Sequence, residues 1–118
     1  MSEDINYTFE IILEQILVCE KRFSRISKPS DFTETVDGDI ILDAIAIRLQ
    51  AISEKLKRIL KHDSFYKEKY PQVEWDKIIR FRDYISHHYE LLDFEIIYEI
   101  CKLDLPILKE VVKKELLK

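Results

Sequence analysis

The stretch DIILDAIAIRLQAISEKLKRILK, residues 39–61, decides the fold of this chain. Its apolar residues recur at spacings of three and four, the pattern of one buried face of an α-helix. These residues are Ile41, Ala44, Ile45, Leu49, Ile52, Leu56 and Leu60. Another face carries the basic residues Arg48, Lys55, Arg58 and Lys61. The stretch therefore predicts a long amphipathic helix with one side packed against the rest of the molecule.

Another long helix is predicted ahead of this stretch, from residue 5 to about residue 26. The same spacing links its apolar residues Phe9, Ile12, Ile16 and Cys19. The sequence SKPSD at 27–31 breaks this helix. Residues 32–37 are expected to form a loop or a short turn. Gly38, the only glycine, is expected to lie where the chain redirects.

Helix signals also divide the remainder of the chain. Residues 63–64 end the long stretch and cap a short helical turn that Pro71 stops. Residues 74 to about 88 form the next main helix. Asp93 can cap a further helix, and the sequence DLP at 104–106 marks a fresh helix start with proline in the first turn. We predict an all-α fold, an antiparallel bundle of four to five helices forming one domain over residues 1–118.

Composition agrees with a helical domain. The chain has 118 residues, and its hydrophobic fraction of 47% excludes a disordered chain. One glycine and three prolines are poor material for the turns of a β-rich fold. No apolar run approaches the ~20 residues that a membrane span needs. The sequence MSED at the N-terminus lacks a signal-peptide pattern, so a cytoplasmic protein is expected.

The two cysteines, Cys19 and Cys101, lie in apolar helical surroundings. They lack the spacing of metal ligands, so both are expected to be reduced and mostly buried.

Charge is spread unevenly over the chain, whose net charge is −4. Residues 1–47 hold four basic and ten acidic residues, residues 48–82 ten and five, and residues 83–118 five and eight. The middle segment alone favours an anionic ligand, unless its charges form an ordinary solvated helix face. The net negative charge of the whole chain argues against tight, nonspecific binding of nucleic acid.

The sequence RDYISHHY, residues 82–89, holds the strongest functional signal. It combines an arginine, a carboxylate, two imidazoles and a phenol. A permanent cation beside a group that titrates near neutrality suffices to cleave a phosphodiester without a metal. The alternative is a charged helix end that happens to contain two histidines.

Helix geometry limits how these residues can act together. Arg82 and His87 are five residues apart, about 140° around a regular helix, so they cannot easily contact one phosphate. Either the helix ends or unwinds near Ser86, or two chains share the site, which a two-fold dimer allows. Asp83 and His87 are four apart, so the carboxylate could orient the imidazole and raise its pKa, or form an ordinary surface pair.

Other chemistries fit less well. The chain has no Glu-x-x-His or Cys-x-x-Cys spacing, and no metal or other cofactor is expected. His87 and His88 lie about 100° apart on a helix and would chelate poorly. His62 is expected to be a surface cation at a helix end. A triad of Ser86, His87 and Asp83 is disfavoured, because neighbours on one helix cannot align a nucleophile, a base and an orienting group.

RNA supplies part of the chemistry itself, because its 2′-OH can attack the neighbouring phosphate. The protein needs a base for that proton, an acid for the leaving 5′-oxygen and a cation for the phosphorane. His87 could serve as base or acid with its two-fold mate in the other role, and Arg82 could clamp the phosphate. DNA lacks the 2′-OH and would resist this route.

The residues Arg82, His87 and Tyr89 resemble the Arg-x4-His-x-Tyr signature of the HepT toxins within the HEPN superfamily. Asp83 stands where that family often has Asn. Further segments that resemble the family are RLQAISE at 48–54 (with Ser53 where Gly is common), YPQVEW at 70–75, IRFRD at 79–83, DFEIIY at 93–98 and DLPIL at 104–108. In this order and at these spacings, the resemblance covers nearly the whole chain.

The resemblance implies a two-fold homodimer and a metal-independent endoribonuclease that acts as the toxin of a toxin–antitoxin pair. It implies Arg82 and His87 as catalytic residues, with Asp83 beside them. It also implies a partner, a minimal nucleotidyltransferase antitoxin of the MntA type, which would adenylylate Tyr89. Bulk and negative charge added there would block an RNA phosphate. The alternative function is a non-catalytic helical subunit that binds or regulates such a nucleotidyltransferase.

Overall fold

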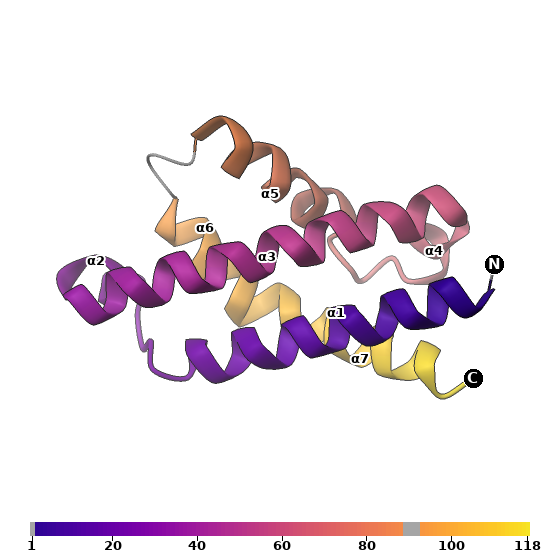
Figure 1. Cartoon of the computed structure of the whole chain (residues 1–118), viewed down its shortest axis with the longest axis horizontal. Helices are drawn as coiled ribbons and strands as arrows, with labels where there is room; N and C mark the ends of the chain where they lie inside the picture. Colours follow the sequence, from indigo (N-terminus) through magenta and orange to yellow (C-terminus); the bar gives the residue numbers. More distant parts are fainter. Residues whose placement is uncertain (1, 89–92) are drawn as a thin grey trace.

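The helix α3 (Val36–His62) runs along the length of the molecule and packs against most of the other helices (Figure 1). The structure is a computed structural model that describes residues 2–88 and 93–118, with the side chains of 5–81 and 93–118. The remaining elements are α1 (Ser2–Phe23), α2 (Asp31–Glu34), α4 (Phe65–Lys69), α5 (Trp75–His88), α6 (Phe94–Glu99), the π-helical segment η1 (Ile100–Asp104) and α7 (Leu105–Leu116). Within these described ranges the chain forms helices and no strand, which confirms the predicted all-α fold.

Neighbouring long helices run in opposite directions. Both α1 and α5 are antiparallel to α3, and the run from α6 through η1 to α7 returns along α1 (Figure 1). The closest packing is between α3 and α1 and between α3 and α5. The short helices α2 and α4 lie in the connections at the two ends of α3.

The core lies where α1, α3 and the C-terminal helices meet. Side chains with no exposed surface come from α1 and α3 at the predicted spacings: Phe9, Ile12, Ile16 and Cys19, and Ile45, Leu49, Ile52 and Leu56. Ile41 and Leu60, at the ends of the predicted stripe, are partly buried. Both cysteines are buried free thiols, as predicted. Among the described residues no helix is long and apolar enough to span a membrane.

The expectation for Gly38 was wrong. Gly38 lies in the first turn of α3 with a negative φ, and the chain redirects at Thr35, which is extended and caps the helix. The Thr35 side chain accepts a hydrogen bond from the Gly38 N–H at 2.8 Å, so α3 begins at Val36 rather than at Asp39. A Cβ at position 38 would lie 1.8 Å from the carbonyl oxygen of Asp31. Glycine is required there because α2 approaches closely, not because a turn needs its backbone freedom.

The predicted fresh helix start at residues 104–106 was also wrong. Asp104 has helical backbone angles and makes no side-chain cap, so α6, η1 and α7 form one continuous helical run. Pro106 lacks an N–H, and in an α-helix its ring would collide with the carbonyl four residues earlier. The wider π turn before it relieves that collision, and the Leu105 N–H bonds the carbonyl of Ile100. Asp93 does cap α6 as predicted, accepting hydrogen bonds from the N–H groups of Glu95 and Ile96.

Candidate functional site

The helix that carries the RDYISHHY motif is α5, and its N-terminal half is held tightly against α3. Trp75, Ile78 and Phe81 are buried on that side. The buried Ser53 of α3 lies with its Oγ 2.5 Å from the carbonyl oxygen of Ile78, a direct contact between the two helices. The Trp75 indole N–H donates to the carbonyl of Tyr70 at 3.0 Å and ties the helix start to the preceding turn.

The backbone of α5 stays α-helical through His88. The helix therefore does not end or unwind near Ser86, which was one of the two ways to bring Arg82 and His87 together. On this regular helix the two residues occupy positions about 140° apart around the axis, whereas Asp83 and His87 are one turn apart on one face. The side chains of residues 82–88 and the whole of Tyr89 lie outside the described part of the structure.

A second connection to α5 comes from the C-terminal run and has no counterpart in the sequence analysis. Lys77 Nζ lies 2.5 Å from Glu99 Oε1 and 2.8 Å from Asp104 Oδ2. Asp104 is buried in η1. Burial alone would lower the pKa of Lys77, but the two carboxylates outweigh it and hold that pKa above its ordinary value. Lys77 is thus cationic at neutral pH, and its ion pairs join α5 to the junction of α6 and α7.

The basic middle segment is only partly neutralised by neighbouring carboxylates. Lys67 pairs with Asp76 at 2.8 Å, and Lys69 pairs with the buried Glu115 at 3.0 Å. Among the side chains that the structure describes, four basic ones of this segment are exposed on α3 and α5: Lys57, Arg58, Lys61 and Arg80. Whether they bind an anion stays a prediction. His62 is the exposed last residue of α3, which is the position expected for a cation at a helix end.

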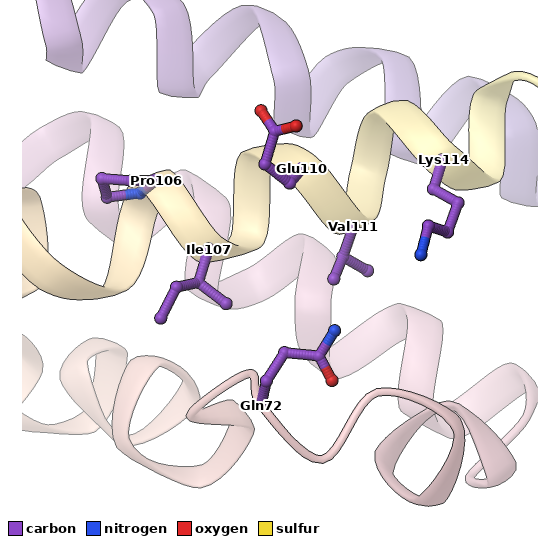
Figure 2. A pocket seen from close by; sticks show the side chains of 6 residues that line it. All are labelled: Gln72, Pro106, Ile107, Glu110, Val111 and Lys114. Atoms are coloured by element: carbon purple, nitrogen blue, oxygen red, sulfur yellow. The ribbon is translucent and has the colours of Figure 1, made fainter.

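A hollow of about 340 Å³ lies elsewhere, between the α4–α5 connection and α7 (Figure 2). Ile107 and Val111 point towards Gln72 across it, and Glu110 points away. Its remaining lining residues are Pro106 and Lys114. With an apolar floor and neither His nor Arg, this hollow does not supply the groups that phosphodiester cleavage needs.

The described residues contain no cluster of three or more His, Cys, Asp or Glu side chains placed to hold a metal ion.

Comparison with known proteins identifies the family of this helical bundle. A family model described as "Ribonuclease HepT-like" matches residues 12–115. The chain belongs to the HepT-like family. The predicted family is thereby confirmed, and the RDYISHHY motif lies within the matched range.

Individual relatives agree with this assignment. "Putative RNase TTE0752" of Caldanaerobacter subterraneus is 32% identical over 107 residues, 90% of this chain and 92% of that protein. "Putative RNase MJ1380" of Methanocaldococcus jannaschii is 28% identical over 101 residues, 86% and 90% of the two chains. "Gamma-glutamylcyclotransferase and putative RNase MJ0434" of the same organism is 27% identical over 97% of this chain, which spans only 48% of that longer protein. No solved structure matches significantly.

Proposed function

We propose that this HepT-like protein is a cytoplasmic, metal-independent endoribonuclease and the toxin of a toxin–antitoxin pair. RNA is cleaved by attack of its own 2′-OH on the neighbouring phosphate. Arg82 clamps the phosphate, His87 transfers the proton, and Asp83 orients His87. A minimal nucleotidyltransferase of the MntA type silences the toxin by adenylylating Tyr89. The family and the names of the relatives support the ribonuclease activity.

The observation that carries the proposal is the regular course of α5 through His88. Over five residues the axis rises about 7.5 Å and turns about 140°, so one chain presents Arg82 and His87 in different directions. A two-fold dimer resolves this, because Arg82 of one protomer can meet the partner's His87 in one cleft. Each dimer then has two equivalent composite sites.

An exposed apolar strip on α3 supports the dimer. Val36, Ile40 and Ile47 are 78%, 59% and 66% exposed, and their spacing of four and seven residues places them on one side of this helix. The same helix carries exposed acids near its start, Asp39 and Asp43, and exposed lysines near its end, Lys57 and Lys61. Antiparallel pairing of two copies of α3 about Gln50 would place Asp43 opposite the partner's Lys57 and Asp39 opposite the partner's Lys61. Such a surface is complementary to itself, as a two-fold interface requires.

Adenylylation offers a physical route to silencing. Tyr89 follows His87 by two positions, so an AMP group on its hydroxyl adds bulk and a phosphate charge beside the site. An RNA phosphate would meet both a steric block and like-charge repulsion.

The first experiment measures cleavage of cellular RNA by the purified chain in a chelator. We expect products with 2′,3′-cyclic phosphate ends, and loss of cleavage in Arg82→Ala and in His87→Ala. His62→Ala is the matched control, because this exposed histidine lies at the end of α3. If clean wild-type protein cuts no RNA pool, the ribonuclease proposal is wrong, and stable co-purification with a nucleotidyltransferase would then favour the non-catalytic subunit.

The second experiment tests the antitoxin. The chain is coexpressed with a minimal MntA-type nucleotidyltransferase, and its intact mass is measured. We expect an increment of one AMP that Tyr89→Phe removes and that Tyr7→Phe, a change at an exposed tyrosine of α1, leaves in place. An unmodified wild-type chain, or an increment that survives Tyr89→Phe, would contradict the proposed regulation.

A further inference from the structure

A buried carboxylate in η1 faces the helix that carries the catalytic motif. The side chain of Asp104 is 7% exposed, and its Oδ2 lies 2.8 Å from Lys77 Nζ. Glu99, one turn earlier in the C-terminal run, holds the same ammonium at 2.5 Å. Among the described residues, the buried Asp104 Oδ2 meets a cation at Lys77, and this contact is an ion pair without hydrogen-bond geometry. Lys77 thus bridges α5 to both ends of the π turn.

The π turn is what brings this carboxylate inside. In η1, Ile100, Cys101 and Asp104 are buried, whereas Leu103 is 56% exposed. A polar residue therefore occupies a core position while a neighbouring leucine faces solvent, the reverse of what apolar burial favours. Single π turns are rare inside helices and are frequent at functional sites. The π turn thus accommodates Pro106 and also contains a carboxylate in the core.

Stability alone does not explain such a pair. Removing two charges from water offsets much of their attraction, and well-packed apolar residues of similar size often stabilise a protein as well or better. Apolar packing, however, is not directional, so it tolerates small slides and rotations of a helix. The contacts of Lys77 with Glu99 and Asp104 instead limit how far the Lys77 ammonium, and with it α5, can move from the C-terminal run.

The two contacts on α5 come from different sides. Ser53 meets the backbone of Ile78 from α3, and Lys77 reaches the C-terminal run from a position about 100° around the helix. These two contacts add to the buried packing of Trp75, Ile78 and Phe81 and hold α5 from more than one direction. His87 lies ten residues beyond Lys77, about 15 Å along the axis, so a tilt of about 4° at Lys77 moves His87 by about 1 Å. A displacement of that size can cost about a hundredfold in rate.

We infer that Lys77 is a positioning residue, whose ion pairs with Glu99 and Asp104 set the orientation of α5 and hence the place of Arg82 and His87 in the site. This inference rests on the ribonuclease activity proposed above and deepens it. Lys77 itself touches no substrate. It acts through α5, and Asp104 is the fixed point against which that helix is aligned.

The test separates alignment from stability by replacing the pair with apolar residues. Four forms of the full chain are compared: wild type, Lys77→Met, Lys77→Arg and the double variant Lys77→Met with Asp104→Leu. Lys77→Met leaves a buried carboxylate unpaired and should lower Tm. The double variant should regain the wild-type Tm, yet its kcat on an RNA oligonucleotide should stay at least about tenfold low, with KM changed less than about threefold. Lys77→Arg keeps the charge and should retain most of kcat. Recovery of kcat together with Tm in the double variant would overturn the inference.

A second measurement does not depend on catalysis. The 1H–13C signals of the His87 imidazole should differ between wild type and the double variant, whereas those of His62, at the far end of α3, should coincide. Unchanged His87 signals would overturn the inference even if the nuclease is active. If wild-type protein cuts no RNA, the ribonuclease proposal fails, while the His87 signals still decide whether Lys77 aligns α5.

Discussion

The contact between α3 and α5 at Ser53 allows a test of whether the packing of these two helices controls RNA cleavage. Ser53 is fully buried, and its Oγ lies 2.8 Å from the Leu49 carbonyl oxygen and 2.5 Å from that of Ile78. We compare Ser53→Ala, which only removes the hydroxyl, with Ser53→Leu, which adds a branched apolar group at the same point. The first change keeps the distance between the helices, and the second does not.

The contact distances give the expected magnitudes. Both carbonyls lie inside helices and keep their backbone partners, so Ser53→Ala leaves no buried group unsatisfied and should change the free energy of unfolding by about 1 kcal/mol or less. A carbon atom needs about 3.5 Å where the hydroxyl now sits at 2.5 Å from the Ile78 oxygen, so Ser53→Leu must move α5 by about 1 Å. Overpacking of this kind costs about 1–3 kcal/mol. The same displacement at the motif should reduce kcat by about a hundredfold.

Urea unfolding can be followed through Trp75, the only tryptophan, which is 3% exposed at the start of α5. RNA cleavage is measured under conditions in which both variants are fully folded. We expect Ser53→Ala to resemble wild type in both assays and Ser53→Leu to lose far more activity than stability. A Ser53→Leu variant with wild-type kcat would refute the argument that this crossing sets the position of the motif.

Three further predictions concern the rest of the fold. Gly38→Ala should lower the free energy of unfolding, measured in urea, by about 1–3 kcal/mol, because the alanine Cβ would lie 1.8 Å from the Asp31 carbonyl oxygen. This clash should outweigh the better helix propensity of alanine. A variant more stable than wild type would contradict the prediction. Burial alone would raise the pKa of Glu115, but hydrogen bonds from Tyr70, Lys118 and Lys69 hold this pKa below its ordinary value. The ionised Glu115 therefore stabilises the folded chain fully above the unfolded pKa of about 4.3. This contribution to the free energy of unfolding is lost as the pH falls through the lower folded pKa. When thermal unfolding is measured from pH 7 to pH 3, the Tm of Glu115→Gln should therefore fall less than the Tm of wild type. Parallel curves of Tm against pH for the two proteins would contradict this role of Glu115. Burial raises the pKa of Cys19 to about 12, so a thiol reagent should label it at pH 8 only after unfolding in urea, and fast labelling of the native chain would disprove its burial.

Periodicity predicted the parts of the fold that depend on one helix at a time. The apolar spacing of residues 39–61 predicted which face of α3 is buried, because a helix must turn its apolar side to the core. The cap at Asp93 was also predictable, since a carboxylate at that position satisfies N–H groups of the same helix. Burial of the cysteines followed from their apolar neighbours. These features require no knowledge of what lies across the interface.

Features that depend on contacts between helices were missed. Gly38 is explained by the approach of α2, and the ion pair of Lys77 with Asp104 joins residues 27 positions apart. Helix signals at residues 104–106 were read as a start, but the π turn before Pro106 lets one helix continue. Nothing local distinguishes these cases from an ordinary turn, a surface lysine or a helix N-terminus. For the site, the spacing of Arg82 and His87 left two arrangements open. The helical course of α5 argues against a helix end near Ser86, and the site shared by two chains stays a proposal.

The central claim is that two chains share each site, and mixing two inactive variants tests it most directly. Arg82→Ala and His87→Ala are unfolded together, refolded as a 1:1 mixture and assayed for RNA cleavage. If Arg82 of one protomer acts with the partner's His87, half of the dimers are mixed and one of their two sites is intact, so about a quarter of wild-type activity should return. If each chain carried a complete site, every site in the mixture would lack one residue. Activity no higher than that of either variant alone would contradict the shared site.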